Sequence, residues 1–374
     1  MGNSLLLKKI EDKTIVWFQQ SNRYVVVENT AAVVLQQLEN KVPIPEIADV
    51  LSKKLNVPLE AARPFVKDTQ KLLASFSKTS ETTTKKYFEA PKTFQTTKKY
   101  YINSVIFYVH FESELEESFV HPKFAHTTIE TTEKPDYTYT VFQKEDHIVL
   151  HVNGAQIGCW PMGETHYFQG KFSMQIVQHM HQKEEAAWLG VFHASAVSDG
   201  KKSMLFLGDS GNGKSTSLAL LQAHGLTCLA DDFVPVAKDN NNVYSFPSAI
   251  SIKKNSVPVL LPLYPELNNA AEYHFKRLNK IVRYLPPNNK NNRLHLPCND
   301  FVFIKYPKDS EIQVEKISNL DAFERVVPDA WLSPLAENAQ KFLDWFQTIR
   351  CYQITYGNNK KMLDAVSKLF HDDV

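Results

Sequence analysis

The sequence has few cysteines and no long apolar run. The cysteines are Cys159, Cys228, Cys298 and Cys351. They form no CxxC pair and have no histidine nearby at ligand spacing, so we expect reduced, mostly buried thiols rather than disulfides or structural zinc. No apolar run approaches the roughly 18 residues that cross a bilayer. The start, MGNSLLLKK, is too short and too soon charged for a secretory signal, which predicts a cytoplasmic protein without a membrane partner.

Net charge is lacking as well. The chain of 374 residues carries 42 Lys and Arg against 41 Asp and Glu, a formal charge of +1. No overall field would therefore draw the protein onto nucleic acid or an anionic membrane. Hydrophobic residues make up 43% and charged residues 22%, as in ordinary globular proteins. The length suggests two domains or three.

Glycine is scarce, with 12 in the whole chain, yet three lie in the segment GDSGNGKST at 208–216. This segment meets the pattern G-x-x-x-x-G-K-[ST] and joins an apolar stretch, SMLFL, to a helix-like one, SLALLQAH. Strand, glycine loop and helix in this order are typical of a P-loop. The sequence therefore predicts a nucleoside triphosphate site.

The residue types of this loop each suit a phosphate. Glycines let several backbone N–H groups point at one centre, and the helix N-terminus adds partial positive charge. Lys214 can reach terminal phosphates, and the Ser215 hydroxyl can bind Mg²⁺. The predicted nucleotide-binding residues are Gly208, Asp209, Ser210, Gly211, Asn212, Gly213, Lys214, Ser215 and Thr216.

Two acids, Asp231 and Asp232, end the apolar segment LTCLADDFVPV after the P-loop helix. Ends of neighbouring strands open into one crevice in an α/β sheet, so these carboxylates should lie beside the phosphates. Adjacent side chains on an extended backbone point in opposite directions, so Asp231 and Asp232 should have different roles. We place Asp232 with Ser215 at Mg²⁺ and keep both aspartates as candidates for the catalytic base.

Two further sites are candidates on weaker grounds. His193 lies in GVFHASAV, an apolar run that could form a strand next to the P-loop strand. The segment FKRLNKIVRYLP at 275–286 offers Arg277, Lys280 and Arg283 in a loop-rich region. A mobile arginine there could neutralise charge on a transferring phosphoryl group, and Arg283 is our candidate for that contact.

The first 76 residues read as a small α+β domain. Strands are predicted at 14–18 and 23–28, followed by a helix over 29–40 with Asn29 as its N-cap. A second helix is expected at 43–56 and a third from near Pro64 to Phe76.

The remaining chain should begin with a polar linker at 77–92 and a β-rich region from Tyr100 to about Gly170. A helix is predicted over 172–190, then the β–loop–α–β core around the P-loop. Residues 239–248 and 255–299 look loop-like. A last strand, helical segments around 321–348 and 359–370, and CYQITYG between them are expected to close a domain over 93–374.

The segments FHASAV, MLFLGDSGNGKST and LTCLADDFVPV, in this order, resemble the core of the HPr kinase/phosphorylase family. The resemblance implies an α/β P-loop domain that uses ATP to phosphorylate serine. It implies phosphate and Mg²⁺ contacts for Lys214 and Ser215, base and metal duties for the two aspartates, and a place near the transferred phosphate for His193. No counterpart of the family's L-G-I-I-D segment occurs, so dephosphorylation and the carrier HPr are not implied. Family members form hexamers, which leaves a homo-oligomer open.

The segment YVVVENTAAVVLQQLENKVPIPEIADVLSKKLNV resembles the PqqD-like family of small winged-helix domains. This resemblance implies that residues 1–76 bind a peptide as an added β-strand. DNA binding is a rival, because Arg63, Lys67 and Lys71 form a basic helix stripe. Residues 1–78, however, hold 11 Lys and Arg against 8 Asp and Glu, which is thin for neutralising several phosphates.

Together these observations predict a kinase for a hydroxyl, Ser or Thr, of a peptide or small protein recruited by the first domain. Tailoring of a ribosomally made peptide is the process that the pairing suggests. Two alternatives stay open: a regulator that binds nucleotide without phosphotransfer, and a small-molecule kinase. Sequence-selective DNA binding would favour the first, and turnover of free serine or a sugar alcohol the second.

Overall fold

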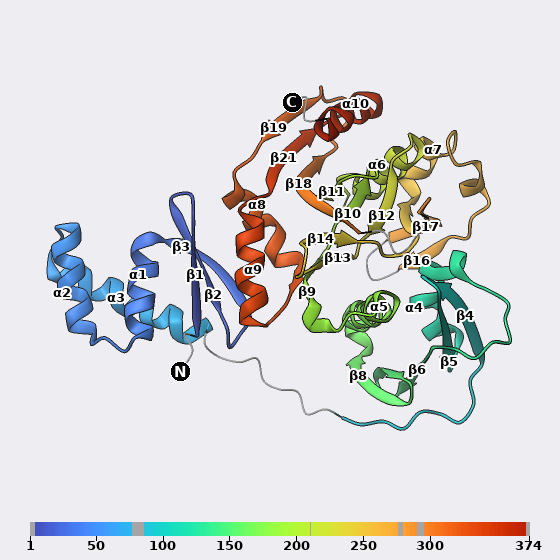
Figure 1. The fold of residues 1–374 in the computed structure, drawn as a ribbon, viewed down its shortest axis with the longest axis horizontal. Helices are drawn as coiled ribbons and strands as arrows, with labels where there is room; N and C mark the ends of the chain where they lie inside the picture. The colour runs from blue at the N-terminus through green and yellow to red at the C-terminus, as the bar shows by residue number, and fades with distance from the viewer. Residues whose placement is uncertain (1–3, 77–85, 210, 276–279, 290–294, 372–374) are drawn as a thin grey trace. The chain divides into compact units, whose positions relative to one another are not determined.

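The computed structural model describes residues 4–76, 86–209, 211–275, 280–289 and 295–371. Across these residues the chain is a mixed α/β protein with several sheets and ten α-helices (Figure 1). It forms two compact units, one of residues 1–83 with 318–349 and one of residues 84–317 with 350–374. The first unit thus takes in a segment, 318–349, that the sequence analysis placed in the second domain.

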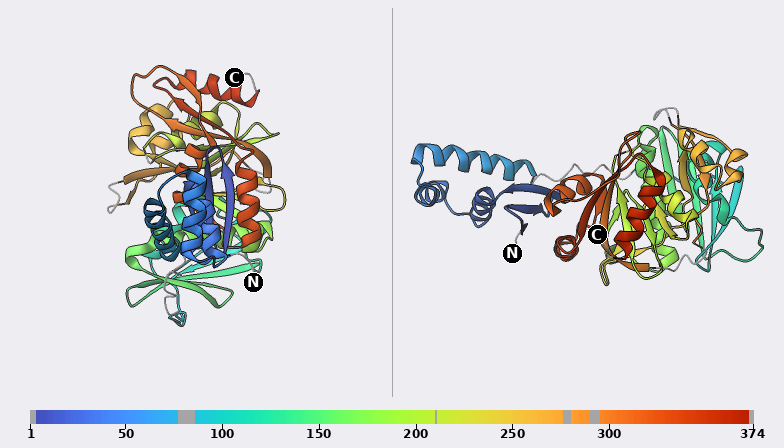
Figure 2. Two further views of the ribbon diagram at one scale, coloured as in Figure 1. Left: turned by 90° about the vertical axis from the view of Figure 1, so that its left-hand side faces the viewer. Right: turned by 90° about the horizontal axis from the view of Figure 1, so that it is seen from above.

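The first unit begins with an antiparallel sheet and three helices. The strands, in the order β1-β2-β3, are β1 (Leu5–Ile10), β2 (Lys13–Phe18) and β3 (Arg23–Glu28). The helices are α1 (Asn29–Glu39), α2 (Ile44–Leu55) and α3 (Leu59–Phe76) (Figures 1 and 2). Phe18 of the sheet packs on Phe76 of α3, with ring centroids 5.1 Å apart, so the sheet and the long helix share a core.

Two expectations for this region were wrong in detail. α3 begins at Leu59 and contains Pro64, because the carbonyl of Pro58 already accepts the first helical N–H groups. Asn29 does not cap α1; its side chain binds Thr14 Oγ1 and the carbonyl oxygen of Asp12, each at 2.7 Å. Asn29 therefore joins the helix to the preceding hairpin. Strand β1 had not been predicted.

Residues 318–349 supply the other elements of the first unit. They form α8 (Asn319–Val326), β20 (Ala330–Leu332) and α9 (Ala336–Phe346). The ring of Tyr24 in β3 lies edge-on to Phe323 of α8 and Phe342 of α9, with centroids 6.1 and 5.6 Å apart. Both phenylalanines are buried. The N-terminal sheet therefore uses this distant segment as part of its core.

The second unit opens with a five-stranded sheet in the order β4-β5-β6-β7-β8. Its elements are β4 (Thr96–Ile102), β5 (Val105–Phe111), α4 (Glu114–Phe124), β6 (Tyr137–Lys144), β7 (His147–Val152), β8 (Ala155–Pro161) and α5 (Thr165–His181). The predicted helix over 172–190 was wrong at its end, because Gln182 takes a left-handed conformation and the chain re-enters a strand at Trp188. Helix α4 had not been predicted.

The predicted linker at 77–92 falls largely outside the described residues, since 77–85 are not described. Residues 86–92 have no regular structure, but Phe88 is buried against Phe142 and Val149 of the five-stranded sheet. This end of the segment is therefore part of the second unit. No helix in the described ranges is long and apolar enough to cross a membrane.

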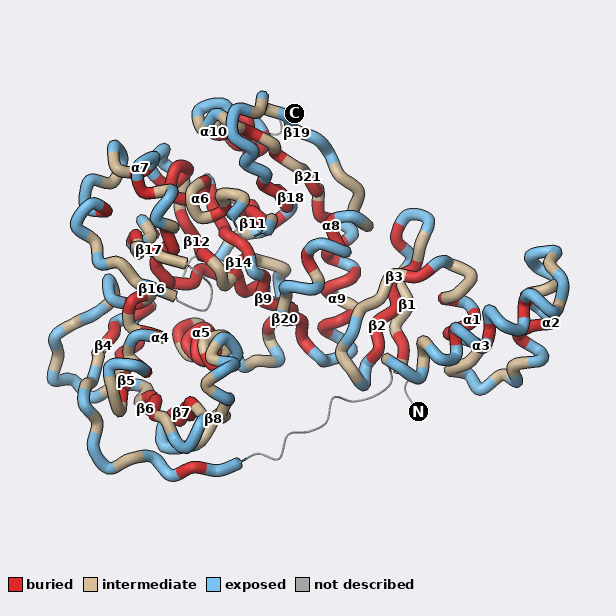
Figure 3. Tube along the Cα trace, turned by 180° about the vertical axis from the view of Figure 1, so that it is seen from behind, coloured by how far each residue is buried: buried red, intermediate tan, exposed pale blue. Residues whose placement is uncertain are grey.

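A second sheet of this unit follows the order β12-β10-β11-β18-β14-β13-β9, with β21 beside β18 and β19 beside β21. Its strands are β9 (Trp188–Phe192), β10 (Ser195–Ser198), β11 (Ser203–Leu207), β12 (Thr227–Asp231), β13 (Val234–Ala237), β14 (Asn242–Tyr244), β18 (His295–Lys305), β19 (Gln313–Lys316) and β21 (Arg350–Thr355). Helices α6 (Lys214–Ala223) and α10 (Asn359–Phe370) share its hydrophobic core. Figure 3 shows buried residues along β11, β12 and β18.

Strand direction brings the candidate residues together. β10 runs antiparallel to β11 and to β12, so β11 and β12 run the same way and end at one edge. Ser195, the first residue of β10, pairs with Phe206 near the end of β11 and with Asp231 at the end of β12. The chain just before β10, the loop after β11 and the acids that end β12 therefore meet at this edge.

A small sheet, in the order β15-β17-β16, lies partly in the 255–299 region that was expected to be loop-like. It consists of β15 (Ile250–Lys253), β16 (Tyr273–Phe275) and β17 (Lys280–Leu285), with α7 (Val257–Leu260) between the first two. The expectation of loops was wrong for β16 and β17. Val282 and Leu285 of β17 are buried, although the polar composition of the surrounding chain gave no sign of a strand. Short 3₁₀ turns are η1 (Ala125–Thr127), η2 (Met162–Glu164), η3 (Glu185–Ala187), η4 (Lys254–Ser256), η5 (Pro265–Asn268) and η7 (Val327–Asp329).

Candidate functional site

The glycine loop joins β11 to α6 in a conformation that needs glycine. Gly208 has φ +134°, and a Cβ there would lie 2.8 Å from the carbonyl oxygen of Ile304. Gly213 has φ +89°, and its Cβ would lie 3.3 Å from the Tyr356 hydroxyl. Side chains are disfavoured at both positions by backbone conformation and by space. The loop is therefore shaped as a tight cradle at the N-terminus of α6.

Lys214, the first residue of α6, is buried and folds back over the loop. Its Nζ donates to the carbonyl oxygen of Gly208 and lies 3.4 Å from that of Asp209. Within the loop the N–H of Asn212 donates to the carbonyl of Asp209 at 3.2 Å. Thr216 Oγ1 donates to Ser256 Oγ at 2.8 Å. An ammonium and a helix N-terminus thus face the same loop.

Asp231 is buried in a network of hydroxyls. Its Oδ1 accepts hydrogen bonds from Ser195 Oγ at 2.6 Å and Ser215 Oγ at 3.3 Å, and its Oδ2 from the Ser251 N–H at 3.1 Å. Burial, with the neighbouring charge of Asp232, raises the pKa of Asp231 to about 7 in spite of these bonds. The P-loop serine therefore contacts Asp231, whereas we had expected it to share a metal with Asp232.

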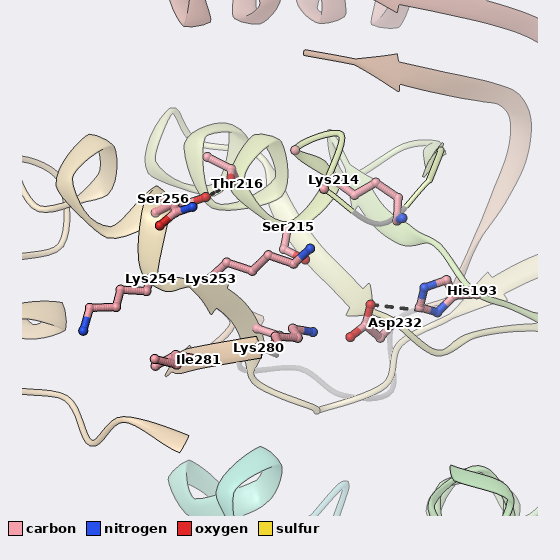
Figure 4. A pocket seen from close by; sticks show the side chains of 14 residues that line it. His193, Lys214, Ser215, Thr216, Asp232, Lys253, Lys254, Ser256, Lys280 and Ile281 are labelled. Carbon is pink, nitrogen blue, oxygen red and sulfur yellow. Dashed lines mark hydrogen bonds and ion pairs between the residues drawn. The ribbon is translucent and has the colours of Figure 1, made fainter. Parts of the chain in front are cut away.

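Asp232 leaves β12 in a left-handed conformation, with φ +62°, and its side chain faces the pocket. Its Oδ1 lies 3.9 Å from His193 Nδ1, and the two side chains are 30% and 47% exposed (Figure 4). Burial acts to raise the pKa of Asp232, but nearby cations outweigh it, so this pKa lies below its ordinary value. Those cations are Lys123, Lys280 and Lys214, and His193 adds to their effect only when it is protonated. Asp232 is therefore the ionised acid of the pair.

These side chains border a cavity of about 540 Å³ in the second unit (Figure 4). Its lining residues are His193, Gly211, Gly213, Lys214, Ser215, Thr216, Asp232, Ser251, Lys253, Lys254, Asn255, Ser256, Lys280 and Ile281. The structure thus joins His193, the P-loop and Asp232 across three chain segments, with Asp231 directly beneath them. β9 ends before His193 and β10 begins after it, so the predicted single strand is two.

Some predicted residues lie elsewhere. The Arg283 guanidinium binds Glu272 Oε1 at 3.0 Å and the carbonyl oxygens of Leu267 and Asn268, and it does not line the cavity. Ser210 and Arg277 lie outside the described residues. Gly208, Asp209 and Asn212 belong to the loop but not to the cavity lining.

Sequence reasoning missed Ser195, Ser251 and Lys253. A signal existed for Ser195, which follows His193 by two residues in FHASAV and so reaches the same sheet edge. Nothing in the sequence pointed to Ser251 or Lys253, because β15 lies between the two predicted loop regions and no element had been assigned to it. Their positions depend on the small sheet packing beside α6.

This donor set suits a magnesium nucleotide. Backbone N–H groups, a helix N-terminus and Lys214 can bind anionic oxygens. Mg²⁺ keeps several waters and uses one or two carboxylates with substrate phosphates. Accordingly, the described residues include no group of three or more His, Cys, Asp or Glu side chains that could hold a metal. Ser215 and Asp231 offer a hydroxyl and a carboxylate instead.

Comparison of the sequence with protein-family models and with curated proteins found no match.

Proposed function

We propose that this protein is an ATP- and Mg²⁺-dependent kinase that phosphorylates a hydroxyl of a peptide or small protein. The observation that carries the proposal is the convergence of three groups at one cavity: the P-loop with Lys214, the Ser215–Asp231 contact, and the Asp232–His193 pair. The glycine loop fits phosphates because Gly208, Gly211 and Gly213 give it a positive-φ backbone at the N-terminus of α6, and the hydroxyl–carboxylate contact fits magnesium.

The roles of the two aspartates follow from their surroundings. Asp231 is buried against Ser215, so we assign it to hold a magnesium-bound water beside the P-loop serine. Asp232 is ionised and faces the cavity, so we assign it as the base. The sequence had suggested Asp232 as the residue at magnesium, so this assignment moves that role to Asp231. Bound magnesium would supply charge neutralisation at the phosphates.

The reaction then balances as a phosphoryl transfer. The acceptor oxygen forms a bond to the γ-phosphorus while the bond from this phosphorus to the β-phosphate oxygen breaks, which releases ADP. The proton of the acceptor hydroxyl passes to the Asp232 carboxylate, where His193 at 3.9 Å can receive or share it. Lys214 and the loop N–H groups bind the charge that builds up on the phosphate oxygens.

The finer fold assignment belongs to this proposal. We infer an HPr-kinase-type P-loop domain within the second unit, since its core has the order histidine, glycine loop, paired aspartates. We infer a winged-helix, PqqD-like domain at the N-terminus, where β3 is an edge of the three-stranded sheet. Beside that edge lies a cavity of about 430 Å³ lined by Asn22, Arg23, Tyr24, Phe76, Val327, Pro328, Ala330, Trp331 and Leu332. An added peptide strand could place its side chains there.

The test is phosphate transfer to peptides encoded beside this protein's gene. Purified protein, ATP and Mg²⁺ should add one phosphoryl group to such a peptide, seen by intact mass. Lys214→Ala should abolish transfer and weaken nucleotide binding, whereas Asp232→Asn should abolish transfer and keep nucleotide binding. Tight nucleotide binding without transfer to any peptide, serine or sugar alcohol would support the regulator instead.

A further inference from the structure

The cavity contains more positive charge than a P-loop supplies. Lys253 ends β15 and Lys280 begins β17, and both side chains line the cavity. Figure 4 shows the Lys253 amino group reaching toward Ser215 and that of Lys280 reaching toward Asp232. Neither lysine belongs to the glycine loop or to α6. The small sheet therefore adds two ammonium groups to the site.

The two lysines serve different sides of the cavity. A Cβ built on Gly211 of the P-loop would lie 4.0 Å from Lys253 Nζ, so Lys253 is on the nucleotide side. Lys280 lies toward the proposed base, and its charge helps to hold the pKa of Asp232 low. An acceptor hydroxyl must approach Asp232 to give up its proton. Lys280 is thus placed beside the acceptor.

The charges around Asp232 do not balance. Lys280 and Lys214 line the cavity around this one half-buried carboxylate, and the charge of Lys123 of α4 also acts on it. The other acid of the site, Asp231, is buried in hydrogen bonds with Ser195, Ser215 and the Ser251 N–H and does not line the cavity. Phosphates can balance Lys214 and Lys253, but the cations on the acceptor side need an anion of their own.

Lys254, unlike Lys280, has a carboxylate among the described residues that neutralises its charge. It follows Lys253 directly, but its side chain points away from Asp232 and is 60% exposed (Figure 4). Its Nζ lies 3.6 Å from Glu272 Oε2, and Arg283 binds the other oxygen of the same carboxylate. Lys254 also lines the cavity, but Glu272 already pairs with its charge, so Lys254 is a control for the effect of an unspecific lysine charge at this site.

We propose that the acceptor carries a carboxylate next to the hydroxyl that is phosphorylated, and that Lys280 binds this carboxylate with Lys123 adding to the attraction. The inference rests on the phosphotransfer function proposed above and narrows its substrate class to acidic acceptors. The carboxylate comes either from an acidic side chain beside the serine or from a chain terminus at the serine. Lys280 is a specificity residue here, and Asp232 remains the base.

The experiment uses the full chain and four synthetic serine peptides. Two have an amidated C-terminus and differ only by Glu or Gln beside the serine; two neutral peptides end at the serine, as free acid or as amide. Binding is measured by fluorescence anisotropy with ADP and Mg²⁺ present, and transfer by intact mass with ATP. We expect one acidic member to bind about tenfold more tightly than its neutral partner, and the favoured pair identifies the source of the carboxylate.

Variants of the lysines test whether Lys280 causes the preference for the acidic peptide. Lys280→Gln should remove the roughly tenfold preference while the KM for ATP changes by less than about threefold, and Lys280→Arg should restore part of it. Lys254→Gln should keep the preference. Equal binding of all four peptides would overturn the proposal. So would a Lys280→Gln variant that keeps the preference but loses ATP affinity. A Lys280-dependent preference without any transfer would uphold acid recognition and overturn the kinase.

Discussion

Asp231 and Asp232 are neighbours in the sequence but experience opposite environments. Asp231 is enclosed by Ser195, Ser215 and Ser251, so burial raises its pKa to about 7. Asp232 turns out of the strand toward cations, which hold its pKa low against the effect of burial. An acid pair with separated pKa values is typical of sites where two carboxylates have different duties.

This difference predicts how stability depends on pH. A carboxyl with a raised folded-state pKa favours folding below its unfolded pKa, and that contribution is lost as pH rises through the folded value, here about 7. Asp231→Asn cannot ionise. Without nucleotide and Mg²⁺, the variant's unfolding free energy relative to wild type should therefore rise by about 1–3 kcal/mol between about pH 5 and pH 8, as urea titrations can measure. An unchanged difference between the two pH values would contradict the buried environment of Asp231.

Gly208 gives a second prediction for a single residue. A Cβ there would lie 2.8 Å from the Ile304 carbonyl oxygen on a backbone at φ +134°. Gly208→Ala should cost about 1–3 kcal/mol of unfolding free energy and weaken ATP binding at the same time. Gly200→Ala is the matched control, since it also has positive φ but nothing within 4 Å. If both variants lost stability equally and both kept their ATP affinity, the close approach of Ile304 to Gly208 would not be what requires glycine there.

Helix α5 carries a pH effect of opposite sign. Burial lowers the pKa of His179 and of His181 to about 4, and His181 Nε2 lies 2.9 Å from the Ser245 carbonyl oxygen. Lowered histidine pKa values give stability that is present above about 6.5 and lost as pH falls toward 4. When the pH is lowered from about 7 to about 5, the unfolding free energy of His179→Phe should therefore fall by about 1–2 kcal/mol less than that of the wild type. Urea titrations at the two pH values measure this difference. Equal acid sensitivity would contradict a neutral buried His179.

Elements with strong local signals were predictable from sequence. The P-loop strand and helix, the β2-β3 hairpin and the β-rich region follow from alternation, glycine spacing and turn residues. The small sheet β15-β17-β16 was not, because its strands are short and separated by polar chain, and only packing against α6 decides their structure. Lys253 and Ser251 were missed with it. The prediction that Arg283 binds phosphate was wrong for the same reason. Arg283 lies in β17 and pairs with Glu272, the residue just before β16.

On the scale of the whole molecule, two distant segments build the first unit. Residues 318–349 provide Phe323 and Phe342, which pack on Tyr24 of the N-terminal sheet. Sequence could not foresee this, because amphipathic helices do not specify which sheet they cover. The segment lies in the chain between β19 and β21 of the second unit. The N-terminal sheet is therefore completed by residues inserted into the other unit's sequence.

Phe342→Ala tests this dependence. The side chain is fully buried, so its loss should cost about 3–5 kcal/mol. Hydrogen exchange followed by mass spectrometry should show lost protection in β1–β3 and α9, while β10–β12 keep theirs. Val50→Ala, an exposed residue of α2, serves as the control and should change little. Protection retained in β1–β3 would contradict the shared core.

The proposed function requires the cavity to transfer a phosphoryl group from ATP to a peptide hydroxyl. Intact mass of a candidate acceptor peptide, after incubation with the protein, ATP and Mg²⁺, tests it most directly. We predict a gain of one phosphoryl group that is lost with Asp232→Asn, although this variant still binds ATP. A peptide of unchanged mass with the wild-type protein, despite tight binding of both peptide and nucleotide, would contradict the claim and leave a nucleotide-controlled binding protein.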